Sequence, residues 1–145
     1  MQNFKKIIVV GGLIYKKSQM LACRRSEHKD QAGLWEVPGG KVENGESCPE
    51  ALKRELQEEL QISVVVQEHI ATSDVQICQQ KQKSLRIIMH VYACMISDIK
   101  KEELIASSDH DDIRWISPDE IQELQWAAAD IPILDAFRTF LRTKK

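Results

Sequence analysis

The sequence has no long apolar segment and no excess of positive charge. Its longest apolar stretch near the start, Ile7–Ile14, is too short to span a bilayer and contains Gly11 and Gly12. Twenty lysines and arginines face 22 aspartates and glutamates, which leaves a formal net charge of −2. These features argue against a membrane protein and against a broadly basic nucleic-acid binder, so we expect neither kind of partner.

The sequence has four widely spaced cysteines and no segment with the composition of a linker. Because no Cys-x-x-Cys pair occurs, we expect neither a zinc site nor a disulfide framework from Cys23, Cys48, Cys78 and Cys94. The first residues carry no small-residue cleavage site, so we expect no export signal and a cytoplasmic protein. Without repeats, low-complexity tracts or Pro/Gly/Ser-rich linkers, residues 1–145 are expected to form one domain.

Strand and helix patterns are mixed without a regular βαβ repeat. They predict strands over 4–15, 19–25, 34–37, 62–66, 85–96 and 113–116, the first broken at its two glycines, with a polar turn over 79–84. Helices are predicted over 47–60, for a short distance from 117, and over 131–141, and the first two open with capping boxes. This mixture predicts an α/β fold in which a mixed sheet lies between helices.

The helix predicted over 47–60 carries three glutamates on one face. At 3.6 residues per turn, Glu55, Glu58 and Glu59 fall within about 100° of one another, beside an apolar stripe of leucines. Like charges at these spacings destabilise a helix by about 0.2–0.5 kcal/mol per pair. A solvated acidic face is the ordinary interpretation of any one such pair, and Arg54 offsets part of the repulsion.

A hard divalent cation would offset the repulsion further. Convergent carboxylates suit Mg²⁺ or Mn²⁺ better than zinc, and protein-bound Mg²⁺ is commonly shared with substrate phosphates. Pro38, Gly39 and Gly40 precede the helix, and glycines let the backbone approach a ligand closely. The pattern therefore indicates phosphoryl chemistry at a glycine corner beside an acidic helix.

The segment from Gly40 to Ile62 resembles the Nudix box. That pattern is Gly, five residues, Glu, seven residues, then Arg-Glu-apolar-x-Glu-Glu-x-Gly-apolar. Gln61 replaces the final Gly of the pattern, which concerns the exit from the helix and no charged position. The matching residues are Gly40, Glu46, Arg54, Glu55, Leu56, Glu58, Glu59 and Ile62.

The resemblance extends along the chain to the MutT-like branch of the Nudix hydrolases. It implies an α/β/α sandwich, a Mg²⁺ cofactor with Mn²⁺ as a substitute, and hydrolysis of a nucleoside triphosphate to a monophosphate and pyrophosphate. One of the box glutamates, or a water that it holds, is implied as the base. The implied metal ligands are Glu55, Glu58, Glu59 and the Gly40 carbonyl, and the implied orienting pair is Arg54 and Glu46.

MutT-like members also recruit an acid from a loop beyond the central strands. Asp109, six residues before Trp115, matches that place best and is a candidate metal ligand. His110 is expected to be an exposed loop histidine and not a catalyst. Four other acids in this region remain alternatives to Asp109, namely Glu102, Glu103, Asp111 and Asp112.

The resemblance also implies residues that contact the nucleotide. Arg25 and Arg86 match arginines near the nucleotide, although each has a plain surface role as its alternative. Asp130 matches a base-reading Asn; an ionised Asp only accepts hydrogen bonds, and the alternative role is to cap the last helix. Val37 is either a contact to the base or plain core, and Gly39 is a further candidate for substrate binding.

The sequence leaves several functions open. Sanitising hydrolysis of 8-oxo-dGTP is the preferred prediction. Residues 31–36 and 129–132 also resemble the bacterial CTP/5-methyl-dCTP pyrophosphohydrolases, so this activity is the first alternative. Hydrolysis of another nucleoside diphosphate derivative and a non-catalytic nucleotide-binding module are the remaining alternatives. A monomer or weak homodimer is expected.

Overall fold

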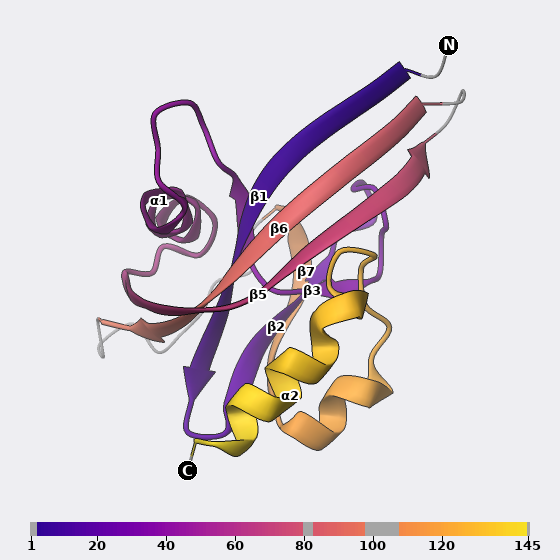
Figure 1. Ribbon diagram of the computed structural model, residues 1–145. Coiled ribbons are helices and arrows are strands. Elements are labelled where there is room, and N and C mark those ends of the chain that lie inside the picture. The colour runs from indigo at the N-terminus through magenta and orange to yellow at the C-terminus, as the bar shows by residue number, and fades with distance from the viewer. Residues whose placement is uncertain (1–2, 80–82, 98–107, 145) are drawn as a thin grey trace.

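A seven-stranded mixed sheet forms the centre of the computed structural model, which describes residues 3–79, 83–97 and 108–144 (Figure 1). None of the described helices has the length and apolar character needed to cross a membrane. The strands are β1 (Asn3–Lys16), β2 (Gln19–Arg25), β3 (Trp35–Glu36), β4 (Gly39–Lys41), β5 (Val64–Gln79), β6 (Lys83–Ile96) and β7 (His110–Ile116). The helices are α1 (Cys48–Leu60), the 3₁₀ segments η2 (Pro118–Glu123) and η3 (Ile131–Ile133), and α2 (Leu134–Arg142).

Parallel and antiparallel pairing coexist in the sheet. Strand β1 runs parallel to β6 over twelve consecutive pairs, from Asn3 opposite Lys83 to Ile14 opposite Cys94. The pairs β1–β2, β1–β4 and β5–β6 are antiparallel, and β7 pairs antiparallel with β2. The prediction of a mixed sheet is therefore confirmed.

The two α-helices cover opposite faces of the sheet (Figure 1). Because side chains alternate along a strand, Val10 and Ile14 of β1 pack with the leucines of α1, whereas Leu13 packs with the cluster around α2. Phe137 and Leu141 of α2 are fully buried. This arrangement is the predicted α/β/α sandwich.

Several predicted boundaries are wrong. The strand predicted over 62–66 begins at Val64 and continues to Gln79. Its length was not predicted because register shifts near His69 interrupt the alternation of side chains along the strand. Strand β1 runs unbroken through its two glycines, and residues 39–41 form a strand that was not predicted. The short helix after Ser117 and the start of the last helix are 3₁₀ segments. Of the turn predicted over 79–84, residues 80–82 lie outside the described residues, whereas Gln79 belongs to β5 and Lys83 and Ser84 belong to β6.

Close backbone approach fixes the glycine corner. Gly39 pairs with Gly11 across β4 and β1, and a Cβ at Gly39 would lie 1.9 Å from the carbonyl oxygen of Val10. Real Cβ atoms essentially never come within 3.0 Å of such an atom, so no larger residue fits without backbone movement. The corner thereby places the next residue, Gly40, directly against α1.

Both ends of α1 are capped. The Ser47 side chain accepts a hydrogen bond from the Glu50 backbone N–H, which is one of the two bonds of the predicted capping box, and the Ser47 hydroxyl donates to the Glu50 carboxylate at 2.8 Å. At the other end Gln61 adopts the left-handed conformation, with φ 52° and ψ 38°, and its N–H donates to the Gln57 carbonyl at 3.1 Å. Gln61 thus keeps the exit geometry of the missing Gly, at a conformational cost of about 1–2 kcal/mol.

We expect the substitution Phe137→Ala to lower the free energy of unfolding by about 3–5 kcal/mol, because a fully buried ring is replaced by a cavity. Urea unfolding followed by circular dichroism measures this change. The control is Val65→Thr, whose side chain is 52% exposed and which should shift stability by no more than about 0.5 kcal/mol. Equal effects of the two substitutions would contradict this account of the core.

Candidate active site

A cleft of about 880 Å³ opens beside the glycine corner and the acidic helix. One wall is apolar and consists of residues from the inner faces of β1, β5 and β6, including Ile7, Ile77 and Leu85. Most of the polar lining residues come from the end of β2 and the loop after it, from Glu36, Lys41 and Glu59, from Asp109 just before β7, and from Asp130 just before η3. Seven predicted site residues line the cleft: Arg25, Val37, Gly39, Gly40, Glu59, Asp109 and Asp130.

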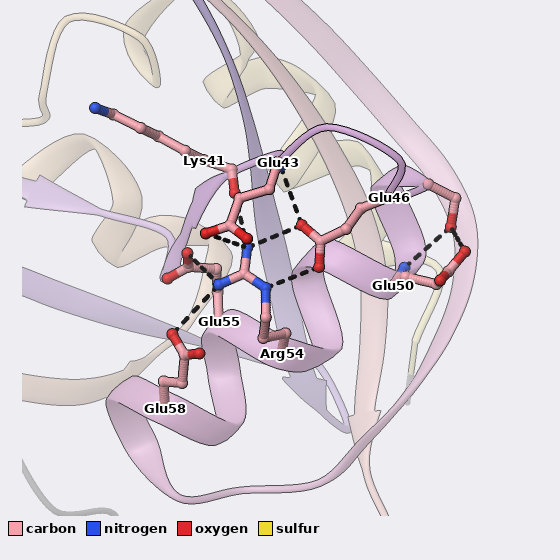
Figure 2. A network of polar contacts seen from close by, with 8 residues as sticks. Lys41, Glu43, Glu46, Glu50, Arg54, Glu55 and Glu58 are labelled. Atoms are coloured by element: carbon pink, nitrogen blue, oxygen red, sulfur yellow. Dashed lines mark hydrogen bonds and ion pairs between the residues drawn. The ribbon is translucent and has the colours of Figure 1, made fainter.

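Arg54 is the hub of the charged network on α1 (Figure 2). Its guanidinium donates to both carboxylate oxygens of Glu46, at 2.8 and 3.0 Å, and to the Lys41 carbonyl at 3.1 Å. It also donates to Glu55 at 3.0 Å and to Glu58 at 3.3 Å. Hydrogen bonding to Arg54 lowers the pKa of Glu46 below its ordinary value. These are the contacts that the orienting role predicted for Arg54 and Glu46 requires.

Glu55 lies against the glycine corner. A Cβ at Gly40 would meet the Glu55 carboxylate at 2.3–2.7 Å, so a larger residue here would displace this carboxylate from its position. The Glu55 side chain is 16% exposed, and its burial raises its pKa although the neighbouring Arg54 opposes the rise. The Glu55 carboxylate is thus held beside the backbone of Gly40.

Glu59 is the least satisfied of the three helix glutamates. Its Oε2 atom is buried and has no hydrogen-bond partner among the described residues. Burial, followed by the negative charges of Glu55, Asp109 and Glu36, raises its pKa from 4.5 to about 8. A buried carboxylate oxygen without a partner is costly unless a cation or another ligand completes it.

Glu58 is placed differently from the other two. Its side chain is 60% exposed, compared with 16% for Glu55, and of the three only Glu59 lines the cleft. The predicted set of three glutamates is therefore divided by the structure. Glu55 lies against Gly40 and Glu59 lines the cleft, while the largely exposed Glu58 contacts Arg54 (Figure 2).

The donor set fits a hard cation. Within the described ranges, no group of three His, Cys, Asp or Glu side chains is already assembled as a metal site. The glycine corner nevertheless offers oxygen donors of the type that Mg²⁺ prefers, since this ion usually keeps several waters and takes few protein ligands. The residues that would hold it are Glu55, Glu59 and the Gly40 carbonyl, with Asp109 as a further candidate that lines the same cleft.

Among the alternatives considered for the loop acid, Asp109 is the one that the described structure brings to the cleft. Asp109 forms an ion pair with Lys29, with 3.2 Å between Nζ and Oδ1. Asp111 pairs with Arg24 and Asp112 pairs with Arg114, and neither lines the cleft. Glu102 and Glu103 lie outside the described residues.

Glu36 is a cleft residue that the sequence did not single out. Its carboxylate accepts a hydrogen bond from Arg25 at 2.8 Å and lies 2.9 Å from Nε2 of His110. His110 is only 3% exposed, so the prediction of an exposed loop histidine was wrong. The signal that could have identified Glu36 is a charged residue between the apolar Trp35 and Val37, just before the glycine corner.

Arg86 is not brought to the cleft. Its neighbours Leu85 and Ile87 line the cavity, so strand alternation turns Arg86 to the other face of β6. There it makes two hydrogen bonds to Asp74, at 2.9 and 2.6 Å. This placement is that of a surface arginine.

Asp130 has a role other than capping. It makes no side-chain cap hydrogen bond, and its Oδ1 accepts from the Val37 backbone N–H at 3.2 Å. Because it is 2% exposed, burial raises its pKa well above the usual range, and the charge of Glu36 adds to the rise. Burial therefore favours the neutral form of the carboxyl, which can donate a hydrogen bond as well as accept one.

Comparisons with known proteins agree with one another. The NUDIX domain model matches residues 5–137. A CTP pyrophosphohydrolase of Escherichia coli (strain K12) is 41% identical over 133 residues, which cover 92% of each chain. A putative 8-oxo-dGTP diphosphatase 2 of Mycobacterium tuberculosis (strain ATCC 25618 / H37Rv) is 30% identical over 123 residues, covering 85% of this chain and 82% of the relative.

Solved structures give the same result. The solution structure of the E. coli ORF135 protein matches with a TM-score of 0.71 and 39% identity, covering 96% of this chain and 92% of that one. The crystal structure of a MutT protein from Methanosarcina mazei Go1 matches with a TM-score of 0.76 and 27% identity, covering 99% and 98%. The similarity thus includes the whole sheet and both helices.

The raised pKa of Glu59 predicts how the metal-free protein responds to pH. The folded state holds this proton more tightly than the unfolded state, so the stabilisation is fully present below about pH 4.5 and is lost as the pH rises through about 8. Glu59→Gln should remove this loss, and its free energy of unfolding in EDTA should exceed that of the wild type at pH 8.5 more than at pH 5.

Cation binding should show the opposite trend. Since an ion must displace the Glu59 proton, the apparent affinity for Mn²⁺ should rise by up to about tenfold per pH unit between pH 6 and 8. Electron paramagnetic resonance of free Mn²⁺ measures this affinity. A flat pH profile for the wild type, or one that Glu59→Gln leaves unchanged, would contradict the assignment.

Proposed function

This chain belongs to the NUDIX domain family, and from that premise we propose that it is a Mg²⁺-dependent nucleoside triphosphate pyrophosphohydrolase. Water would attack an inner phosphorus, the bond to the bridging oxygen would break, and a nucleoside monophosphate and pyrophosphate would leave. The observation that carries the proposal is the buried, unpartnered Oε2 of Glu59 on a cleft that also contains the Gly40 corner.

Some residues of α1 would bind the cation, and others orient the residues that bind it. When bound, Mg²⁺ neutralises polyphosphate charge and lowers the pKa of a coordinated water. Glu55 and Glu59 would hold the ion together with the Gly40 carbonyl, because Glu55 lies against Gly40 and Oε2 of Glu59 is buried without a partner among the described residues. Arg54 keeps Glu55 in place through its 3.0 Å hydrogen bond and is itself fixed by Glu46.

Glu59 is our choice for the group that takes the proton of the attacking water. Its Oε2 atom is buried, has no hydrogen-bond partner among the described residues, and belongs to a residue that lines the cleft, so it can accept a proton there. Glu58 is less suited, since its carboxylate is largely exposed and contacts Arg54. Glu46 is fully engaged with Arg54.

For the base, we favour CTP and related pyrimidine triphosphates, with 8-oxo-dGTP as the second candidate. The neutral form of Asp130, which burial favours, can donate one hydrogen bond and accept another, and both cytosine and guanine offer edges that match this pair. The geometry therefore does not separate the two bases. The relative with 41% identity is a CTP pyrophosphohydrolase, whereas the 8-oxo-dGTP diphosphatase is 30% identical, and this difference supports the order. The preference for 8-oxo-dGTP drawn from the sequence stays a prediction.

We expect Glu59→Gln and Glu55→Gln each to lower kcat/KM by about 10²–10⁴-fold, because each removes a charge that the chemical step uses. Pyrophosphate release from CTP, dCTP, dGTP and 8-oxo-dGTP with Mg²⁺ measures the effect. The matched control is Glu123→Gln, an exposed glutamate of η2, which should retain wild-type activity. A loss of less than about fivefold in both variants would contradict the proposal.

Asp130 should affect the choice of base more than the chemistry. Asp130→Asn keeps a donor and an acceptor, so kcat/KM for the preferred nucleotide should stay within about threefold at pH 7. Asp130→Ala should lower it by about tenfold or more and change the ratio of CTP to 8-oxo-dGTP turnover. Thermal unfolding of each variant controls for loss of structure. Identical base ratios in the wild type and the Ala variant would remove Asp130 from base recognition.

A further inference from the structure

We propose that Lys29 binds the substrate's polyphosphate, and that it does so by leaving Asp109, its partner in the free cleft. Nothing in the known-protein comparisons assigns a role to this residue. The inference rests on the proposed function, since it concerns the same cleft. Lys29 Nζ lies 3.2 Å from Asp109 Oδ1, and the two side chains are 36% and 35% exposed.

The backbone around Lys29 is fixed while its side chain is not enclosed. Lys29 N–H donates to the Ser26 carbonyl at 3.0 Å, and Ser26 N–H donates to the Asp109 carbonyl at 3.0 Å. These bonds tie the loop after β2 to the residue that precedes β7. The Cα of Lys29 is thereby held at the rim of the cleft, and the flexible four-carbon side chain can reorient from it.

The other cations that line the described cleft are less suited to this role. Arg25 is engaged by Glu36 at 2.8 Å and by the Asp30 carbonyl at 2.6 Å. Lys5 lies opposite Leu85 on the apolar wall. The side chain of Lys41 extends away from the Arg54 network (Figure 2). Lys29 stands instead among the carboxylates, where its positive charge opposes the rise in the pKa of Glu59.

The exchange of partners follows from the charges. A half-exposed ion pair contributes little to stability, so leaving Asp109 costs little. If Asp109 takes part in holding a cation, Lys29 competes with that cation in the free protein. A polyphosphate that arrives with the cation supplies a new and more highly charged partner for the ammonium group. Lys29 is therefore expected to oppose binding of the cation alone and to favour binding of the phosphate-loaded cation.

The test compares the wild type with Lys29→Gln, the conservative variant Lys29→Arg, and the control Lys53→Gln, an exposed lysine of α1. Two binding measurements are made without turnover: Mn²⁺ alone by electron paramagnetic resonance, and Mn²⁺-pyrophosphate by calorimetry. Steady-state kcat and KM for CTP with Mg²⁺ form the third measurement. Lys29→Gln should bind Mn²⁺-pyrophosphate roughly tenfold more weakly and raise KM by a similar factor, with kcat within about threefold.

The remaining variants complete the expected pattern. Lys29→Gln should bind Mn²⁺ alone at least as tightly as the wild type, whereas Lys29→Arg and Lys53→Gln should resemble the wild type in all measurements. Equal affinity of the wild type and Lys29→Gln for Mn²⁺-pyrophosphate would overturn the role of Lys29, whether or not CTP is hydrolysed. A wild type that binds Mn²⁺-pyrophosphate but hydrolyses none of the triphosphates would instead overturn the proposed function.

Discussion

The repulsion among the carboxylates of α1, and its control by one guanidinium, is the constraint on which the site depends. Arg54 contacts Glu46, Glu55 and Glu58 at once, so its planar fork sets the positions of three acids. A lysine could not do this, because a point charge lacks the fixed directions of the five N–H donors. Glu59 is outside this network, since its Oε2 has no hydrogen-bond partner among the described residues, and it is the glutamate of α1 that lines the cleft.

The burial of the Glu59 carboxylate positions it on the cleft but lowers the stability of the folded protein when the carboxylate is charged. Its apolar support comes from the leucines of α1, which pack under the sheet and carry the acidic face with them. The same burial that fixes the carboxylate removes water from it and raises its pKa. Unfavourable electrostatics of this kind persist only where the surrounding core holds them in place, and they mark functional positions more often than structural ones.

Much of the fold and the acidic helix could be predicted because their signals are local. Helix spacing, the capping box and the glycine corner all lie within residues 38–62, and short-range rules suffice for them. Contacts between distant segments could not be predicted in the same way. Glu36 meets His110 from 74 positions away along the chain, and no periodicity reveals such a pair. Arg86 was misplaced because one step along a strand exchanges the two faces of the sheet.

The parallel pairing of β1 with β6 has a consequence for how the protein is made. The paired residues lie about eighty positions apart, and such distant pairing is slow because the chain loses much freedom before the contacts form. β1 also supplies the partner of the glycine corner and a wall of the cleft. On the ribosome, the nascent chain would thus present its acidic helix before the central pairing is complete, and the pocket would close only as one of the last events of folding.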